Sequence, residues 1–409
     1  MAFWNDPINF VARWLTGLLI GWHLPGSLAT ILVFVIGITV LIIFAMVLDI
    51  GLVWVERKAV ARFQDRLGPN RIGPFGLIQP VADIIKMVIK EDITPAGADK
   101  IVYNFAPILA ATSVIILWAI LPLASTIYGV DLNVGLLYII AAGSLGTLSI
   151  IMAGWSSNNK YALLGAFRMV ANMVSYEIPM VVVLLVPTIL ANTMSVQGIT
   201  KAQSGMWFAI LSPLAFIIFL ISAIAELGRS PFDLNEAESE IVAGFHIEYT
   251  GMKFGWFYAG ELLHAFTFGG FIAILFFGGY GGFFGLERFG AFTWLNSPFV
   301  QALVFIIKAM FGYWVIMWIK YSMPRIRIDH MLAFNWKLLV PLSLVVLVNT
   351  AILNKVLIGL PSWTYTLVMF GSNLAIGFVT IEILRFYGRK QRLLEKKLPQ
   401  RAQAQEQSL

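Results

Sequence analysis

Residues 28–53 read LATILVFVIGITVLIIFAMVLDIGLV, an apolar run with a single ionisable side chain, that of Asp49. About 20 apolar residues suffice for a helix to cross the hydrocarbon core of a bilayer. Eight further stretches of similar character follow along the chain, which is 59% hydrophobic and only 12% charged. So many apolar side chains cannot be buried inside a soluble globule. The sequence therefore predicts an all-α, polytopic membrane protein.

We expect nine transmembrane helices, because helices satisfy their own backbone hydrogen bonds in lipid and the apolar runs are continuous. They are centred on residues 28–53, 103–127, 136–155, 170–191, 207–227, 257–279, 299–320, 337–357 and 364–386. An amphipathic stretch, Phe10 to Trp22, precedes them without a signal-peptide cleavage site. Residues 1–388 would form one membrane domain, and the basic and polar tail, 389–409, is expected to be partly disordered.

The positions of Lys and Arg predict the orientation, because basic loops stay on the cytoplasmic side. If the N-terminus is outside, only Arg13, Lys201, Arg288 and Lys355 fall in outer segments, while Lys308 lies within a span. The formal charge of +6 then describes a basic cytoplasmic rim rather than a nucleic-acid-binding surface.

The first cytoplasmic segment, residues 54–102, is too long for a simple connection. Apolar residues from Leu77 to Ile89 recur at helical spacing, with Asp83 and two lysines on the other side. This pattern predicts an amphipathic helix on the membrane surface, and packing beneath a partner subunit is a compatible alternative. Turn formers from Gly68 to Gly76 predict a rigid, non-helical loop ahead of this helix.

A dense group of acids follows the fifth expected span. Seven carboxylates lie in or beside the segment between that span and the next, although the chain has only 22 Asp and Glu. They are Glu226, Asp233, Glu236, Glu238, Glu240, Glu248 and Glu261. Carboxylates are costly at a membrane margin, and close ones favour shared protons. A solvated acidic loop is the alternative, and the apolar residues interleaved with the acids argue against it.

Ionisable groups within or at the ends of the spans are few. They are Asp49, Glu177, Glu226, Glu261, Lys308 and Glu382. Such groups form proton relays, or else structural ion pairs or hydrogen bonds to a neighbouring helix. We favour a relay for Glu177, Glu226 and Glu261, and an ion pair or such a hydrogen bond for the isolated Glu382. Glu261 and His264 have the spacing of di-iron ligands, but such sites need two of these motifs, so no metal site is predicted.

The chain contains no cysteine. Disulfides, thiolate-bound zinc and cysteine-bound iron–sulfur clusters are therefore excluded within it. Any electron carrier of that kind belongs to another chain.

Several long motifs then allow a family to be recognised. They are Glu56 to Lys58, Phe63 to Arg71 and Gly76 to Lys86 in the first loop; Gly154 to Tyr161, Arg168 and Ser175 to Glu177; Arg229, Pro231 to Glu240 and Gly244; and Pro324 to Arg327 with Asp329. Together they resemble the quinone-site membrane subunit of respiratory complex I, which is the H subunit of NADH-quinone oxidoreductase. Asn235, Gly260 and His330 depart from the family pattern, whereas the charged positions are kept.

The resemblance implies a subunit of an enzyme complex that couples quinone reduction to proton translocation, in a bacterial plasma membrane. Loops 54–102 and 226–256 would form the quinone chamber and the acidic entrance of a proton path. By the same resemblance, the chamber residues would be Arg57, Arg62, Arg66, Arg71, Arg229 and Asp233. The proton path would comprise Asp83, Glu177, Glu226, Glu236, Glu238, Glu240, Glu248 and Glu261.

The resemblance also implies partners. Peripheral-arm subunits would supply FMN and the iron–sulfur clusters, and small and antiporter-like membrane subunits would surround the chain. Two other functions stay open: the similar subunit of a membrane-bound hydrogenase or a dehydrogenase with another donor, and an ion transporter that works alone.

Overall fold

The computed structural model describes residues 6–233, 242–281, 294–359 and 361–406, and these contain helices and turns but no strand. Eight helices among them are long and apolar enough to cross a membrane. They are α3 (Gly26–Phe63), α5 (Lys100–Leu117) with η2 (Trp118–Ile120), α6 (Gly135–Ser156), α7 (Lys160–Ala191), α12 (Gly251–Phe276), α13 (Pro298–Ser322), the run of α14 (Ile328–Phe334), η6 (Asn335–Leu339) and α15 (Val340–Val356), and α16 (Ser362–Glu406). The predicted all-α membrane fold is confirmed.

The expected fifth span, residues 207–227, is not one continuous helix. It is divided into α9 (Phe208–Leu211) and α10 (Pro213–Glu226). Pro213 lacks an N–H and its ring clashes with a preceding turn, so a new helix starts there. At 1.5 Å per residue α10 is about 21 Å long, less than the ~30 Å hydrocarbon core. The expectation of nine continuous spans is therefore wrong at this place.

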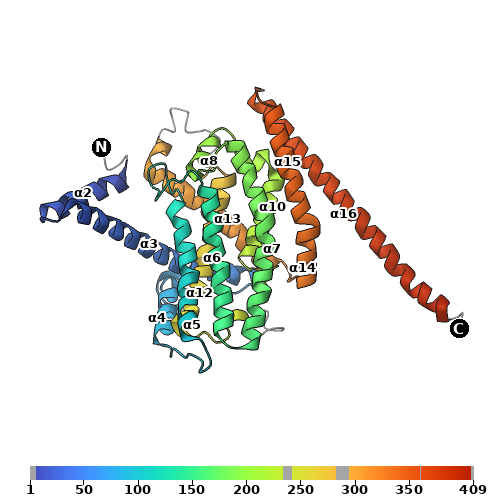
Figure 1. The fold of residues 1–409 in the computed structure, drawn as a ribbon, viewed down its shortest axis with the longest axis horizontal. Coiled ribbons are helices and arrows are strands. Elements are labelled where there is room, and N and C mark those ends of the chain that lie inside the picture. Colours follow the sequence, from blue (N-terminus) through green and yellow to red (C-terminus); the bar gives the residue numbers. More distant parts are fainter. Residues whose placement is uncertain (1–5, 234–241, 282–293, 360, 407–409) are drawn as a thin grey trace.

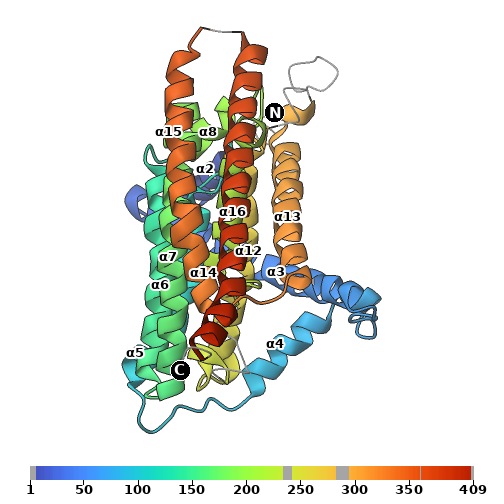
Figure 2. The same ribbon diagram turned by 90° about the vertical axis from the view of Figure 1, so that its right-hand side faces the viewer.

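The two ends of the bundle differ in what covers them (Figures 1 and 2). The start of α12 lies against α4 (Gln79–Ile89), which defines the α4 end, and its last turn lies near α8 (Val196–Ala202), which defines the α8 end. At the α8 end, Lys308 Nζ donates hydrogen bonds to the carbonyls of Phe277 at 2.8 Å and Gly281 at 2.6 Å. Its cation thus caps the C-terminus of α12, where carbonyls lack helical partners.

Helix α12 is the core element of the bundle and packs against α13, α5 and α10. A Cβ added to Gly269 would lie 2.5 Å from the carbonyl oxygen of Ala309 and 2.8 Å from the backbone nitrogen of Tyr313. Gly312 of α13 likewise faces the Gly269 backbone. Small residues allow helix backbones to approach this closely in membranes, where dispersion rather than the hydrophobic effect holds helices together.

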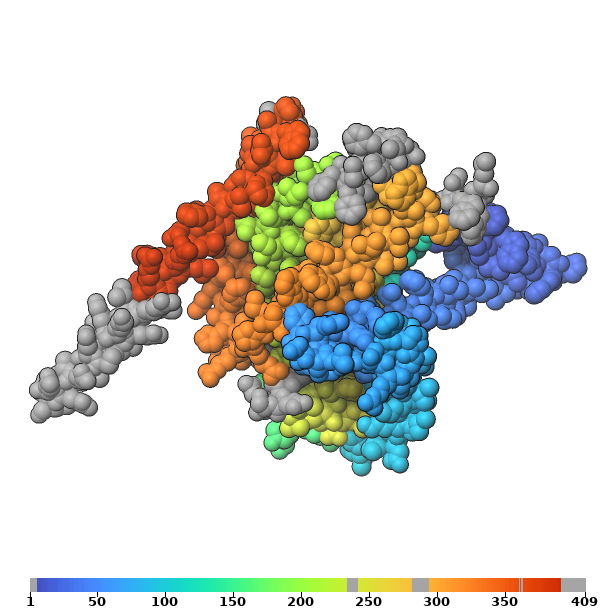
Figure 3. Space-filling view, turned by 180° about the vertical axis from the view of Figure 1, so that it is seen from behind, coloured from blue at the N-terminus to red at the C-terminus, as the bar shows by residue number. Residues whose placement is uncertain are grey.

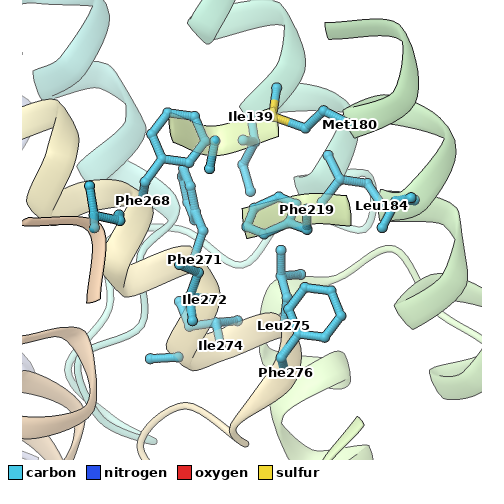
Figure 4. Close-up of a cluster of buried hydrophobic side chains, with 14 of the residues drawn as sticks. Ile139, Met180, Leu184, Phe219, Phe268, Phe271, Ile272, Ile274, Leu275 and Phe276 are labelled. Carbon is cyan, nitrogen blue, oxygen red and sulfur yellow. The ribbon is translucent and has the colours of Figure 1, made fainter. Parts of the chain in front are cut away.

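The second half of α12 is surrounded by a cluster of apolar side chains (Figure 4). Phe268, Phe271 and Leu275 of α12 meet Phe219 of α10, and the ring centroids of Phe219 and Phe268 are 6.3 Å apart. Ile139 of α6 and Met180 and Leu184 of α7 belong to the same cluster. This apolar cluster leaves only a cavity of about 20 Å³ between its side chains.

The predicted surface helix is α4. Its Val88 and Ile89 are largely exposed, so an apolar face of the helix is uncovered by the rest of the chain. The loop before it is non-helical except for the single turn η1 (Pro74–Gly76). Gly76 has φ 77°, and a Cβ there would lie 2.2 Å from the Pro69 carbonyl, so only glycine fits this bend.

Two parts of the chain project from opposite sides of the bundle (Figure 3). They are α2 (Pro7–Gly21) with the first part of α3, and α16. The ion pair predicted for Glu382 is confirmed, since Arg385 lies 2.8 Å away in the same helix. The backbone of α16 is helical to Glu406, and disorder in the tail stays a prediction.

Candidate functional site

A buried arginine organises the α4 end of the bundle. Arg229 follows the last turn of α10 and is only 1% exposed. Its Nε lies 3.2 Å from Glu261 Oε1 of α12, and its Nη2 lies 3.6 Å from Glu56 Oε2 of α3. Burial alone would lower the pKa of Arg229, but the carboxylates of Glu56 and Glu261 outweigh burial and raise the pKa. The guanidinium therefore stays charged between the two acids.

Glu56 joins this cluster to α13. Its carboxylate accepts hydrogen bonds from Lys320 Nζ at 2.9 Å, from the Tyr321 hydroxyl at 2.6 Å and from the Tyr313 hydroxyl at 3.1 Å. A buried carboxylate needs several donors to offset the loss of water. We call Glu56, Arg229, Glu261, Tyr313, Lys320 and Tyr321 the arginine cluster.

A cavity of about 110 Å³ opens beside the arginine cluster. Arg229, Glu261 and Lys320 line it from the cluster, and Glu226 and Asp233 add two further carboxylates. Its other walls are mostly apolar, with Phe257 and Met173 among them. The arrangement places several acids and two cations around space for water, which suits the exchange of protons.

Glu226 ends α10 at the inner side of this cavity and is 3% exposed. No described residue donates a hydrogen bond to its Oε2. A second cavity, about 20 Å³ in volume, lies between Glu226, Glu177 and the apolar cluster. Thr147 Oγ1 is the donor nearest to Glu177, at 3.4 Å from Oε1. The structure thus brings together Glu177, Glu226 and Glu261, the three acids for which the sequence favoured a relay.

Asp233 is held by the loop between α13 and α14. Its Oδ2 lies 3.1 Å from Arg325 Nη2, within the Pro324–Arg327 motif. The backbone N–H of Ile326 also donates to the Pro231 carbonyl at 3.1 Å. Two motifs far apart in sequence are therefore joined beside the cavity.

Other expected site residues lie apart from this cavity. Arg57 pairs with Asp83 between α3 and α4. Arg62, Arg66 and Arg71 are exposed at the end of α3 and in the loop after it. Glu248 accepts a hydrogen bond from Asn159 at 2.7 Å and lines a separate cavity with Lys160. Glu236, Glu238 and Glu240 lie outside the described residues.

Burial shifts the pKa values of two side chains at the α4 end. Burial lowers the pKa of His246, an effect that Glu261 partly offsets. Burial also raises the pKa of Tyr249 to about 12, where its ring stacks on Tyr103 with centroids 4.1 Å apart. Both side chains are therefore neutral near pH 7.

The site residues missed from the sequence are Glu56, Tyr313, Lys320 and Tyr321. Glu56 stood in the first motif but was not assigned a role. Tyr313 lies seven and eight positions before Lys320 and Tyr321, which is the spacing of one helix face, and that pattern could have indicated a shared partner. Within the described residues no three potential metal ligands cluster, so Glu261 and His264 have no such companion.

Known proteins are similar to this chain over most of its length. The family model described as NADH dehydrogenase matches residues 34–351. The H subunit of NADH-quinone oxidoreductase from Dehalococcoides mccartyi strain CBDB1 is 45% identical over 345 residues, which cover 84% of this chain and 92% of that protein. The corresponding H subunit, copy 1, from Geobacter metallireducens is 44% identical over 315 residues, 74% of this chain and 92% of that protein.

A third relative, the H subunit of NADH-quinone oxidoreductase from Geobacillus kaustophilus, is 42% identical over 331 residues, which are 81% of this chain and 96% of that protein. Matches of this length span the first loop, the arginine cluster and the cavity alike. The resemblance inferred from the motifs is confirmed. This chain belongs to the family of NADH-quinone oxidoreductase H subunits.

Proposed function

We propose that the chain is the membrane subunit of a proton-translocating NADH:quinone oxidoreductase. It forms the quinone chamber together with a peripheral arm and couples quinone reduction to proton translocation. The observation that carries this proposal is the cavity that runs from the ion pairs of Arg229 to the unpaired carboxylate oxygen of Glu226. Burial of several ionisable groups costs free energy, and in membrane proteins such groups mark proton relays and ion pathways.

The chamber is assigned to the α4 end. Its residues are Arg57, Arg62, Arg66, Arg71, Arg229 and Asp233. The exposed arginines of the first loop and the uncovered face of α4 suit contact with a partner arm. Loops 54–102 and 226–256 would face this arm, and the tail, 389–409, would lie on the same side of the membrane.

The proton path is assigned to the carboxylates. They are Asp83, Glu177, Glu226, Glu236, Glu238, Glu240, Glu248 and Glu261. Reduction of a quinone in a dry chamber creates negative charge and consumes protons. Nearby carboxylates that interact with one another then change their protonation together. Glu261 and Glu226 line the same cavity and would pass this change toward Glu177.

The redox centres belong to partner subunits in this proposal. The absence of cysteine from the sequence removes the usual ligands of iron–sulfur clusters. Peripheral subunits would supply FMN and the clusters, and small and antiporter-like membrane subunits would surround the chain. The complex would lie in a bacterial plasma membrane, with the N-terminus outside and the C-terminus in the cytoplasm, as the basic loops predict.

The proposal is tested by purifying the native complex in mild detergent through a tag on the C-terminal tail. We expect flavoprotein, iron–sulfur and antiporter-like subunits to co-purify, identified by mass spectrometry, together with NADH:quinone reductase activity. Recovery of a nickel-site hydrogenase subunit would instead place the chain in a hydrogenase. A chain that emerges alone and transports ions by itself would contradict the proposal.

A further inference from the structure

The two cavities share two side chains. Of the residues that line the 110 Å³ cavity, Glu226 and His264 also line the 20 Å³ cavity. His264 lies in the middle of α12, about 20 Å along the helix axis from Gly251. Glu261, one turn earlier, lines only the larger cavity, whereas Phe268, one turn later, lines only the smaller one. His264 therefore stands at the boundary between the arginine cluster and Glu177.

The surroundings of His264 leave its imidazole open to water. The ring packs beside Phe268, with centroids 4.9 Å apart and planes inclined by 39°. In the part of the chain that the structure describes, no side chain or backbone group is hydrogen-bonded to either ring nitrogen. A neutral imidazole carries one donor and one acceptor nitrogen. Both nitrogens can thus bind water in the two cavities.

The sizes of the cavities fit this role. A polar cavity needs about 10–15 Å³ to hold a water molecule that has two to four polar partners. The smaller cavity, about 20 Å³, has room for one such water, with Glu177, Glu226 and His264 as its polar neighbours. The larger cavity has room for several waters. The other walls of the smaller cavity are mostly apolar side chains, Leu184, Phe271 and Leu275 among them.

The burial of Glu226 favours the transfer of a proton to its carboxylate at this point. Its Oε2 is buried without a hydrogen-bond donor among the described residues. An unpaired buried carboxylate oxygen is costly, and a proton or a donor water removes the cost. A group able to deliver a proton beside Glu226 would therefore set whether this carboxyl is charged.

On the basis of the function proposed above, we propose that His264 is the proton-transfer group that joins the two cavities. One ring nitrogen accepts a proton from a water in the larger cavity, and that water takes a replacement proton from the carboxyl group of Glu261. The other nitrogen releases its proton to the water of the smaller cavity, and from there to Glu226 or Glu177. A rotation of the ring then restores the starting tautomer, so no net charge remains on the histidine.

A set of four variants separates proton transfer from packing. His264→Gln and His264→Glu have nearly the same shape, but only the carboxyl can take up and release a proton. His264→Phe keeps a ring against Phe268 and removes both nitrogens. His330→Phe changes an exposed histidine of α14 that lines neither cavity and serves as the control.

Each complex is reconstituted in proteoliposomes, and the rate of NADH:quinone reduction and the number of protons translocated per NADH are measured. We expect His264→Gln and His264→Phe to lower the proton-translocation rate about a hundredfold, the lower range for a positioned acid–base group. His264→Glu should restore much of the rate, and His330→Phe should match the wild type. Equal loss in the Gln and Glu variants, or full translocation in His264→Phe, would overturn the proposal.

The wild-type complex separates this proposal from the one on which it rests. If the wild type neither reduces quinone nor translocates protons, the proposed function fails and the role of His264 fails with it. If the wild type does both and His264→Phe does both equally well, only the role of His264 fails.

Discussion

The two halves of α12 are buried in opposite ways. Its first half, toward the α4 end, carries Glu261 and His264 and faces the 110 Å³ cavity. Its second half carries Phe268, Phe271 and Leu275 in the apolar cluster. Ion pairs and a cavity with room for water stabilise the charged groups of the first half, whereas the second half is packed among apolar side chains around a cavity of only about 20 Å³. One helix can therefore carry part of a proton path in its first half and limit that path with apolar side chains in its second half.

The largest expected effect comes from removing the cation of the first half. Arg229→Met leaves Glu56 and Glu261 facing each other without their shared partner. Loss of one member of a buried ion pair costs about 3–5 kcal/mol of stability. We expect little assembled complex, measured by native gel, and a lower temperature of thermal unfolding in detergent. Arg229→Lys keeps the charge and should lose less. If Arg229→Met is as stable as the wild type, the ion pairs of Arg229 do not stabilise the first half of α12.

The second half should respond to crowding rather than to charge. Gly269→Ala places a methyl group against the Ala309 carbonyl of α13, which must move. Overpacking of this kind costs about 1–3 kcal/mol. Gly371→Ala on α16, where no atom lies within 4 Å of the added methyl, is the matched control and should be neutral or stabilising. Similar melting temperatures for the two variants would show that the α12–α13 contact is not tight.

A polar contact at the boundary of the halves should have a smaller effect. Thr267 Oγ1 accepts a hydrogen bond from Trp118 Nε1 at 2.9 Å. Thr267→Val keeps the shape and leaves the indole N–H unpaired, at a cost of about 1 kcal/mol. Thr39→Val in α3 is the control, because Thr39 donates only to its own helix. The two melting temperatures should differ, and equal values would contradict the expected role of this bond.

The smallest effect is expected outside both halves, at the pair of Arg57 and Asp83. Arg57 is 39% exposed, so water and salt screen the pair. A double-mutant cycle of Arg57→Gln and Asp83→Asn should give a coupling energy of about 0–1 kcal/mol. The coupling should weaken as the ionic strength rises. A coupling as large as that expected for Arg229 would show that the first loop is more deeply buried in the complex.

Much of the fold could be predicted from the sequence, because each span is a long apolar run. The break at Pro213 is the instructive exception. Hydropathy is an average over residues 207–227 and does not register one missing N–H. The backbone helix is nevertheless interrupted where that N–H is missing. Hydropathy also gives no sign of side-chain hydrogen bonds to the backbone. The Gln203 side chain accepts hydrogen bonds from the N–H groups of Phe208 and Gly278 at 3.3 and 3.0 Å.

The site could be predicted only in part. A motif identified Arg229, and the rarity of charge beside the apolar spans identified Glu226 and Glu261, but neither showed that Arg229 joins Glu261 to Glu56. That contact depends on how α3 crosses α12 and α13, and the crossing of helices cannot be predicted from a local sequence pattern. The boundary position of His264 is a property of cavities between helices, so it too could be found only in three dimensions.

The central claim is that the buried acids of this chain couple quinone reduction to proton translocation. The most direct measurement is the pair of rates of NADH:quinone reduction and of proton translocation by the complex with Glu226→Gln, in proteoliposomes, beside the wild type. Gln has nearly the shape of Glu but cannot take up and release a proton. We predict that quinone reduction and proton translocation fall together. Full proton translocation by Glu226→Gln would contradict the account.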